Sequence, residues 1–496
     1  MAVRIKNYIN GKWINSVSGK TLERRNPANT SEVVTIFPRS DKRDVDTAVK
    51  AARTAFEKWS RTPAPKRGHY LFKAAEILEQ RKNELGKIVT KEMGKILPEG
   101  LGDVQEAIDT CYYFAGEGRR LQGETVPSEL ANKDAKTVRE PIGVFGLITP
   151  WNFPIAIPSW KIAPALVCGN TVVFKPSQFT PLCATKFVEI FDEVGLPSGV
   201  LNLVHGTGSE IGDEILKHKE VDAISFTGST ATGARIKELC AATGKEAACE
   251  MGGKNAIIVM DDANLDLALD GAIWGGFGTS GQRCTAASRL ILHEKIFEKF
   301  LTKFVSRAKK LKLGNGLQKT TQMGPVVNEE QYIRVLNHIE IGKKERAKLL
   351  TGGKPAKTKE KGYFIEPTIF IGKPGMHIEQ EEIFGPVVTV LKAKNLEHAI
   401  QIANDTKYGL VSSIYTQDVN KSARAEKELK TGLVYINAPT IGAEIHLPFG
   451  GIKASGSGHP EAGGRGGAID TYSSVKVIYR DYSGKLQRAQ IDVKYD

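Results

Sequence analysis

The sequence lacks the long apolar segments of a membrane protein. No stretch approaches the roughly 18 apolar residues that a membrane helix needs, and the opening residues, MAVRIKNYINGKW, contain no uninterrupted apolar segment typical of a secretory signal. We therefore expect a cytoplasmic protein with no membrane partner.

Cysteines and histidines at metal-ligand spacing are also absent. The six cysteines are dispersed without any CxxC pair, and the nine histidines show no spacing typical of ligands. This pattern argues against a zinc site and against a disulfide framework. We expect reduced thiols and no bound metal.

Positive charge is abundant but has no concentrated pattern. The formal net charge is +13, yet the basic residues are spread over stretches such as 294–312 and 354–361 and do not alternate with aromatic residues. A single-strand nucleic-acid binder combines a basic groove with aromatic rings on which bases stack. We therefore expect a solvated basic surface and no nucleic-acid partner.

The length of the chain indicates more than one domain. A single hydrophobic core stops growing at roughly 250 to 300 residues, and this chain has 496. Hydrophobic residues make up 41% and charged residues 25%, as in globular proteins. Two or three folded domains are expected.

Short apolar runs alternate with helical patterns, which favours an α/β fold. The segment 45–59 has its apolar residues on one helical face, and a longer helical pattern covers about 69–95. Runs that suit strands buried on both faces of a parallel sheet occur at 144–149, 171–175, 200–205, 223–227, 256–260, 289–292, 387–391 and 412–415. Helical patterns lie between them at 181–194, 210–218 and 296–311. We predict two α/β domains with parallel sheets.

Two stretches fit neither domain. The segment 121–138 is rich in polar residues, and the chain after Ser473 contains VKVIY, which has β character. They could form a small arm that adds strands to a neighbouring subunit, although a disordered loop and tail would look similar in sequence.

Cys284 is the first candidate for chemistry. It lies in FGTSGQRCTAASR, where the glycines let backbone amides approach a substrate closely. A backbone N–H beside the sulfur can stabilise the oxyanion that forms when a thiolate attacks a carbonyl. Taken alone, however, an unpaired cysteine is more often a small core residue.

Glu250 and Asn152 are candidates with equally plain alternatives. Glu250 precedes Gly252 and Gly253, and a carboxylate in an apolar cleft can accept a proton near neutral pH. It could instead be a surface carboxylate. Asn152 lies between two prolines in ITPWNFP, where its amide could donate to an oxyanion or only stabilise a turn.

A phosphate-binding turn follows the predicted strand 223–227. Gly228, Ser229 and Gly233 fall where that strand would lead into a helix, whose first amides can bind an anion. The pattern is not GxGxxG, so the signal is weak. Lys175 adds a cation at the carboxyl end of another strand, the edge at which open α/β sheets bind ligands.

Seven separated segments together resemble one known family, the aldehyde dehydrogenases. They are ITPWNFP (148–154), FKPS (174–177), FTGST (226–230), EMGGK (250–254), GQRC (281–284), EEIFGPV (381–387) and PFGGIKASGSG (448–458). The resemblance covers nearly the whole chain in the family's order and spacing.

The resemblance implies a reaction and a role for each candidate. Cys284 is the expected nucleophile, Glu250 the general base and Asn152 the side-chain donor to the oxyanion, with the Cys284 backbone N–H as the second donor. The implied reaction oxidises a small-molecule aldehyde through a thiohemiacetal and a thioester, with a nicotinamide cofactor as hydride acceptor.

The resemblance also implies a cofactor site and a substrate tunnel. Trp160 and Phe449 are expected to line the tunnel. The expected cofactor-binding residues are Ile148, Thr149, Pro150, Trp151, Lys175, Ser177, Gln178, Gly208, Gly212, Phe226, Thr227, Gly228, Ser229, Gly252, Glu382 and Phe384.

The family's architecture gives the expected domains. It implies an aldehyde dehydrogenase-like α/β fold with two Rossmann-like parallel-sheet domains and a small β arm. The NAD(P)-binding domain is predicted at 1–120 and 142–250, the catalytic domain at 251–450, and the oligomerisation arm at 121–141 and 471–496. A homodimer or homotetramer is the implied assembly.

One departure from the family pattern concerns the choice of cofactor. Members that prefer NAD often have a glutamate three residues after the lysine, where it repels a 2′-phosphate. Here that residue is Gln178. A neutral amide lacks the repulsion, so we expect either NAD or NADP to serve, with NADP tolerated or preferred.

The substrate and two alternatives remain open. PTIGAEIHLPFGG and the tail DYSGKLQRAQID resemble members that act on semialdehydes, such as those of 2-oxoglutarate and aminoadipate, whereas Trp160 stands where some of those enzymes have an arginine. The first alternative is a member that releases its acyl group to CoA, which Glu250 speaks against. The second is a structural or binding homologue without activity.

Overall fold

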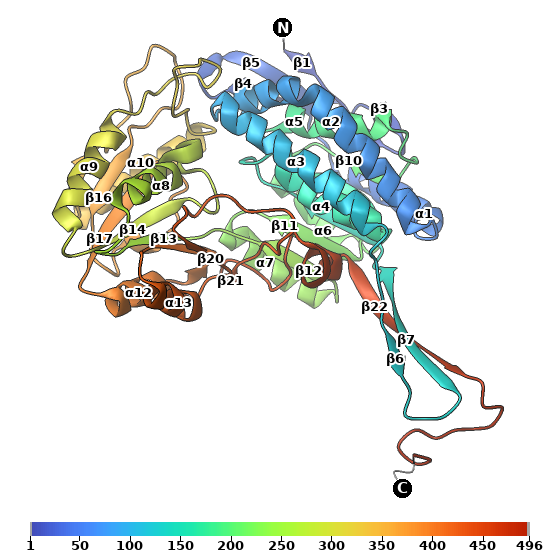
Figure 1. Cartoon of the computed structure of the whole chain (residues 1–496). Coiled ribbons are helices and arrows are strands. Elements are labelled where there is room, and N and C mark those ends of the chain that lie inside the picture. Colours follow the sequence, from blue (N-terminus) through green and yellow to red (C-terminus); the bar gives the residue numbers. More distant parts are fainter. Residues whose placement is uncertain (1, 494–496) are drawn as a thin grey trace.

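The computed structural model describes residues 2–493, and its core consists of two α/β units. Residue 1 and residues 494–496, which the predicted ranges 1–120 and 471–496 include, lie outside the described residues. Figure 1 shows the two units side by side with a β arm projecting away from them. The α/β prediction is confirmed.

The first unit is built on a seven-stranded sheet. Its strands in order are β12 (Glu246–Glu250), β11 (Ala223–Thr227), β8 (Val144–Ile148), β9 (Thr171–Lys175), β10 (Leu201–Leu203), β2 (Asn7–Ile9) and β3 (Lys12–Ile14). The strands from β12 to β10 are parallel, and β2 and β3 are antiparallel additions. A turn at Asn10 and Gly11, with φ of 50° and 72°, separates β2 from β3.

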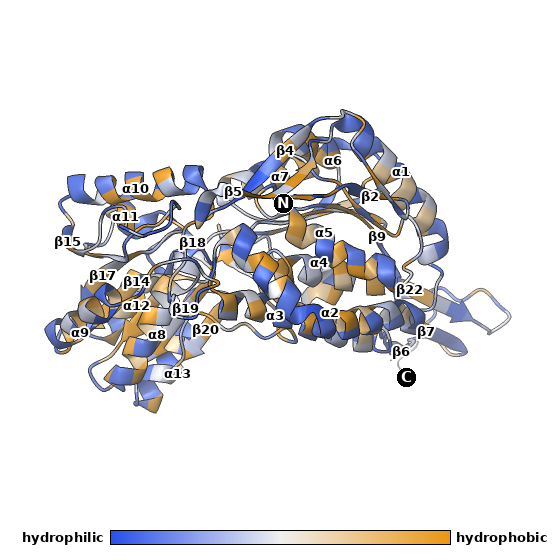
Figure 2. Ribbon diagram, turned by 90° about the horizontal axis from the view of Figure 1, so that it is seen from above, coloured by the Kyte–Doolittle hydropathy of each residue, from blue (hydrophilic) through white to orange (hydrophobic). Residues whose placement is uncertain are grey.

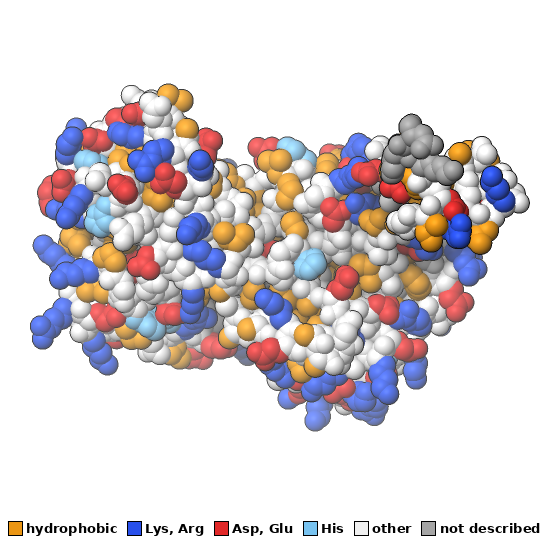
Figure 3. Space-filling model, turned by 90° about the horizontal axis from the view of Figure 1, so that it is seen from below, with side chains coloured by type: hydrophobic (Ala, Val, Ile, Leu, Met, Phe, Trp, Pro, Cys, Tyr) orange, Lys and Arg blue, Asp and Glu red, His pale blue; other side chains and the backbone are white. Residues whose placement is uncertain are grey.

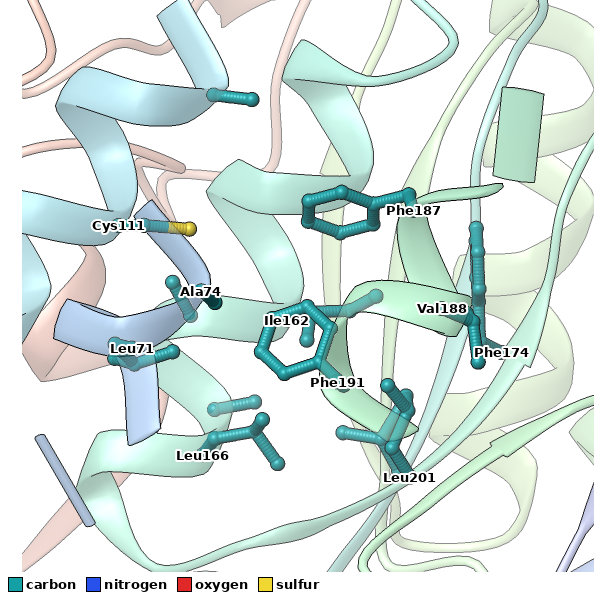
Figure 4. Packing of buried hydrophobic residues seen from close by; sticks show 14 of the residues in the cluster. Leu71, Ala74, Cys111, Ile162, Leu166, Phe174, Phe187, Val188, Phe191 and Leu201 are labelled. Carbon is teal, nitrogen blue, oxygen red and sulfur yellow. The ribbon is translucent and has the colours of Figure 1, made fainter. Parts of the chain in front are cut away.

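Helices cover both faces of this sheet. Alternate strand residues point to opposite faces, so Phe145 and Val172 belong to one core and Val144 and Val173 to the other. The first core also contains α2 (Ala64–Met93), α3 (Leu97–Glu117), α4 (Ala156–Cys168) and α5 (Pro181–Glu193). Figure 4 shows this packing. The second contains α1 (Lys42–Trp59), α6 (Asp213–Lys217) and α7 (Thr230–Ala242).

The second unit repeats the design with another seven-stranded sheet. Its strands in order are β15 (Lys348–Thr351), β16 (Thr368–Ile371), β17 (Val387–Ala393), β14 (Ala287–His293), β13 (Asn255–Val259), β19 (Val411–Tyr415) and β20 (Leu433–Ile436). Only β15 runs antiparallel to its neighbour. One face packs on α8 (Leu265–Phe277) and α9 (Phe297–Lys309), the other on α12 (Leu396–Asn404) and α13 (Val419–Glu428). Helices α10 (Glu329–Lys344) and α11 (His377–Gln380) form a further cluster.

The arm is a three-stranded antiparallel sheet. It joins β6 (Thr125–Pro127), β7 (Lys133–Pro141) and β22 (Ser473–Asp481), and the pairing of β22 with β7 brings the two outlying segments together. Val475, Val477 and Tyr479 on β22 are 57%, 53% and 66% exposed. Because these apolar side chains face solvent, the arm presents a surface that a second chain could cover.

Several small elements were not foreseen from the sequence. A separate sheet joins β1 (Val3–Arg4), β5 (Asn29–Pro38) and β4 (Thr21–Asn26), and β18 (Tyr408–Gly409) pairs with β21 (Ile452–Lys453). The predicted helix at 210–218 is instead a π-helical turn, Gly208–Gly212, followed by α6, and a short α14 (Ile469–Thr471) precedes β22. The helical pattern predicted from 69 begins earlier, at Ala64.

The surface follows from this layering. Apolar residues lie along the strands and on one side of the helices (Figure 2), while basic and acidic side chains are interspersed over the face shown in Figure 3. Within residues 2–493, no helix is both long enough and apolar enough to cross a membrane. In the same residues, no group of three or more His, Cys, Asp or Glu side chains is arranged to hold a metal ion.

Candidate active site

Cys284 lies between the two units, in a turn with an unusual backbone. It follows α8 and a short helical turn at Gly278–Gly281, in which Thr279 and Ser280 have φ of 52° and 57°. The Ser280 hydroxyl donates to the Gly324 carbonyl at 2.7 Å, and the Asn255 amide donates to the Cys284 carbonyl at 2.7 Å. The nucleophile candidate is therefore held on a fixed backbone, with its side chain partly exposed.

The Cys284 thiol is not ionised by its surroundings. Burial, followed by the negative charges of Glu382, Glu461 and Glu250, raises its pKa to about 12. A thiol with this pKa needs a base before it can attack a carbonyl.

Glu250 ends β12 and is 2% exposed. Its Oε2 accepts a hydrogen bond from the Gly451 N–H at 3.0 Å, whereas Oε1 accepts none from the described residues. Burial and then the charge of Glu461 raise its pKa well above the ordinary carboxyl value. One oxygen of a proton-accepting carboxylate is thus available to a water molecule or a thiol.

A buried ion pair beside Glu250 was missed by the sequence reasoning. Lys161 and Glu461 are 0% and 2% exposed and form a salt bridge, and Thr227 donates to the same Glu461 oxygen. Lys161 also donates to the Ser225 hydroxyl at 2.7 Å. A signal existed, because Lys161 is the one charged residue in the largely apolar helix α4, AIPSWKIAPALVC.

Asn152 lies in the loop between β8 and α4 and is 2% exposed. Its Oδ1 accepts no hydrogen bond from the described residues. A buried amide without a partner is unusual, so this side chain is suited to a ligand. It lines a cavity together with Gly252 and Glu382.

That cavity, of about 130 Å³, gathers many of the predicted cofactor residues. Its lining consists of Pro150, Trp151, Asn152, Thr227, Gly228, Ser229, Gly252, Gln331, Arg334, Glu382 and Phe384. Gln331 and Arg334 come from α10 and belong to no motif recognised in the sequence. They tie α10 to the segment that carries Glu382 and Phe384, because Gln331 donates to the Phe384 carbonyl at 2.8 Å and Arg334 to the Glu382 carbonyl at 3.0 Å.

The position of the Glu382 carboxylate depends on the glycine at position 252. Its Oε1 accepts from the Gly253 N–H at 3.1 Å, and a Cβ on Gly252 would lie 2.1 Å from its Oε2. Any other side chain at position 252 would displace the carboxylate. Burial raises the pKa of Glu382 to about 7, so its charge changes near neutral pH.

The remaining predicted cofactor residues lie outside that cavity. Lys175 ends β9, donates to the Pro176 carbonyl at 3.0 Å, and has its pKa lowered to about 8 by burial. Ser177 and Gln178 follow it, and Gln178 Oε1 is buried without a donor among the described residues. Ile148 ends β8, and Thr149 N–H donates to the Lys175 carbonyl at 3.3 Å.

The last three predicted cofactor residues, Gly208, Gly212 and Phe226, also lie outside the lining of the cavity. Gly208 and Gly212 bound the π-helical turn, and a Cβ on either would meet no atom within 4 Å. Phe226 packs in the core beneath α7, so its side chain does not line the cavity. A Cβ on Gly228 would lie 2.4 Å from the Phe226 ring, so a residue with a side chain at position 228 would clash with that ring.

Trp160 and Phe449 form an aromatic wall beside the nucleophile. Their ring centroids are 4.9 Å apart in an edge-to-face arrangement, and both residues are 5% exposed. Cys284 packs against the small cluster that they form with Leu410 and Ala462. The structure thus brings together the predicted nucleophile and the two predicted substrate residues.

Comparisons with known proteins agree with this arrangement. The model of the aldehyde dehydrogenase family matches residues 13–478. Alpha-ketoglutarate semialdehyde dehydrogenase of Haloferax volcanii is 44% identical, over 96% of this chain and 99% of that protein. The Bacillus subtilis alpha-ketoglutaric semialdehyde dehydrogenase is 43% identical, over 95% of this chain and 97% of that protein.

A solved structure extends the likeness to three dimensions. Betaine aldehyde dehydrogenase from Staphylococcus aureus in complex with NAD+ has a TM-score of 0.94 and is 39% identical, covering 97% of this chain and 96% of that chain. Family match, relatives and fold agree over nearly the full length. This chain therefore belongs to the aldehyde dehydrogenase family and is an NAD(P)-dependent oxidoreductase that converts an aldehyde into a carboxylic acid.

Proposed function

We propose that Cys284, Glu250 and Asn152 carry the reaction, as nucleophile, general base and oxyanion donor. Three observations support this. Asn152 lines the cavity beside Glu382, and Cys284 packs against the cluster of Trp160 and Phe449. The unpartnered Glu250 Oε1 lies against Gly450, the residue after Phe449.

The first half of the reaction forms a bond between Cys284 and the substrate. Because the pKa of Cys284 is raised, the thiol gives up its proton, through water to solvent, as it attacks. The sulfur bonds to the aldehyde carbon, and the carbonyl electrons move onto oxygen. The Asn152 Nδ2 and the Cys284 backbone N–H donate to that oxyanion. Its collapse expels the aldehyde hydrogen as hydride and leaves a thioester on Cys284.

The second half frees the enzyme. Glu250 Oε1 takes a proton from water, and the resulting hydroxide attacks the thioester carbonyl. The carbon–sulfur bond breaks, the carboxylic acid leaves and Cys284 is restored. Trp160 and Phe449 limit the access of other water to the thioester.

The cavity residues fit a dinucleotide. Gly252 keeps the wall open beside Glu382, Ser229 caps the N-terminus of α7, and buried oxygens of Thr149 and Gln178 have no partner among the described residues. When bound, the nicotinamide accepts the hydride. Trp151, Glu382 and Phe384 would hold that end, and Lys175, Ser177 and Gln178 the adenosine end.

NADP is proposed to be tolerated or preferred, because Gln178 brings no negative charge beside Lys175. The Gln178→Glu variant tests this. It is expected to lower kcat/KM with NADP about tenfold or more and to spare the value with NAD. Equal effects on both cofactors would contradict the proposal.

The proposed substrate is a semialdehyde with a carboxylate, such as 2-oxoglutarate semialdehyde or aminoadipate semialdehyde. Relatives with 43% and 44% identity are named for such a substrate. Trp160, where an arginine would otherwise bind the carboxylate, favours an uncharged or longer chain instead. Activity tenfold higher on hexanal than on any semialdehyde would therefore overturn this substrate class.

The experiment follows reduced-cofactor formation by the purified protein. A panel of aldehydes and semialdehydes is tested with NAD and with NADP, and Cys284→Ala is the control. Turnover that the control lacks, with acid accumulating in the absence of CoA, is the expected result. Turnover that requires CoA would instead support the CoA-acylating alternative. Cofactor binding without turnover of any aldehyde would support a structural or binding role.

The larger organisation is also a proposal. We assign residues 1–120 and 142–250 to cofactor binding, 251–450 to catalysis, and 121–141 with 471–496 to an oligomerisation arm. The support is that each range contributes most of its strands to one sheet. We further propose a homodimer or homotetramer that works in the cytoplasm.

A further inference from the structure

Helix α3 carries two buried carboxylates that reach the two sides of the reaction centre. Glu99 is 8% exposed and Asp103 is 0% exposed. Residues four apart lie on the same face of a helix, so both side chains leave α3 in the same direction. Neither residue belongs to a motif that the proposed mechanism uses.

Asp103 holds the loop that carries Asn152. Its Oδ1 accepts hydrogen bonds from the backbone N–H groups of Ile155, at 3.2 Å, and Ala156, at 2.8 Å. These amides begin α4, which has no side-chain cap of its own. Asp103 therefore supplies the cap from another helix and fixes the point at which the Asn152 loop ends.

Lys95 completes this contact. It donates to Asp103 Oδ2 at 3.0 Å, and both side chains are fully buried. The Lys95 Nζ also lies 3.7 Å from the ring centre of Phe153, the residue after Asn152. The loop is thus held at two points, at the Phe153 ring and at the start of α4.

Glu99 holds the turn that carries Cys284. Its Oε1 accepts hydrogen bonds from the Thr279 N–H at 2.7 Å and from Arg283 at 3.3 Å. Thr279 and Ser280 have left-handed backbone conformations, which persist only when the surroundings impose them. Arg283 immediately precedes Cys284, so Glu99 ties both ends of the turn.

Stability alone does not account for these buried charges. A buried ion pair can often be replaced by apolar residues without loss of stability, whereas a fixed geometry requires directional contacts such as these. We propose that Glu99 and Asp103 are positioning residues, which set the Cys284 turn and the Asn152 loop at a fixed separation from one helix. The proposal rests on the functions proposed above for Cys284 and Asn152.

A double-mutant cycle tests the proposal in the full-length enzyme with cofactor. Asp103→Asn and Glu99→Gln are each measured in the wild-type and in the Asn152→Ala background. Asp109→Asn, an exposed carboxylate on α3, and Glu117→Gln, a buried one paired with Arg120, are the controls. Steady-state kcat and KM are measured for one aldehyde with cofactor saturating.

The expected reductions in kcat differ between the Asp103 and Glu99 variants. Both variants keep an acceptor oxygen but lose the negative charge that strengthens the contacts, with Lys95 for Asp103 and with Arg283 for Glu99. Asp103→Asn should therefore lower kcat at least tenfold in the wild type but less than threefold when Asn152 is already alanine, because it acts through that amide. Glu99→Gln acts through the turn that carries Cys284, so its factor of at least ten should be the same in both backgrounds. The two controls should change kcat less than threefold.

Other results would overturn the proposal or its premise. If Asp103→Asn lowers kcat by the same factor in both backgrounds, or not at all, Asp103 does not position Asn152. A kcat unchanged by Glu99→Gln would remove Glu99 from the proposal. Wild-type kcat in Asn152→Ala would refute the oxyanion role itself. Should Asp103→Asn fail to fold, Lys95→Gln is used instead, because it removes the cation that contacts Phe153 and Asp103. It should lower kcat at least tenfold in the wild type and less than threefold in Asn152→Ala.

Discussion

Replacing Glu250 by glutamine should separate the two halves of the reaction. The change keeps the size of the side chain, and the amide oxygen can still accept the Gly451 N–H that now bonds Oε2 at 3.0 Å. What is lost is a proton acceptor at Oε1. General-base catalysis contributes roughly 10²–10⁴ in rate, which corresponds to about 3–5 kcal/mol of barrier. We expect kcat to fall by that factor because thioester hydrolysis becomes slow.

Rapid mixing of the variant with aldehyde and cofactor gives the decisive observation. A burst of reduced cofactor, about one per active site, should precede a slow steady rate, because hydride leaves before the base is needed for hydrolysis. Glu246→Gln, an exposed carboxyl at the start of the same strand, should behave as wild type. Loss of the burst together with the steady rate would show that Glu250 is required for the attack of Cys284 as well. An undiminished steady rate would refute its role as base.

Two further predictions concern the cofactor and the arm. The pKa of Glu382 is raised to about 7 by burial, so the carboxylate that can accept from ribose hydroxyls exists mainly above that pH. Cofactor affinity, measured by fluorescence titration, should rise up to about tenfold from pH 6 to pH 8, and Glu382→Gln should abolish that dependence; an equal slope in the variant would contradict the reasoning. On the arm, Val477 is 53% exposed, and Val477→Asp should shift the protein towards monomers in light scattering while Ser474→Asp does not. A wild-type protein that is already monomeric would contradict the assembly.

The parts of the fold that the sequence predicted are those with local signals. The run TVVFK was predicted as a strand with the bounds that β9 has, because a strand buried on both faces is a short apolar run between polar residues. Helix α1 was predicted from its apolar stripe. The short strand region at 8–13 was also predicted, and β2 and β3 lie there. Its antiparallel direction and the strand β15 were not predicted, because both depend on pairing with residues far away in the chain.

Helix α3 shows why apolar periodicity can fail to predict a helix. Its inward face carries Glu99 and Asp103, both buried. A method that reads apolar periodicity treats each as a break in the stripe, so the helix was not predicted although it is one of the longest in the protein. Glu99 and Asp103, whose charges interrupt the apolar pattern, are also the residues that contact the Cys284 turn and the end of the Asn152 loop.

The candidate site divides in the same way. Cys284, Glu250 and Asn152 stand in short motifs and were identified from the sequence, and their catalytic roles stay predictions. Gln331 and Arg334 were missed because α10 meets the cavity only in the folded chain.

The buried charges that were missed still left a usable signal. Removing one partner of a buried ion pair costs about 3–5 kcal/mol, so a lysine within an apolar helix, such as Lys161 in α4, implies a carboxylate opposite it. The sequence can therefore indicate that a partner exists. It cannot identify Glu461, 300 residues away, because that pairing is decided by how α4 packs against the loop before α14. Buried charges in apolar patterns are, for this reason, the positions at which sequence reasoning should expect an unseen contact near a site.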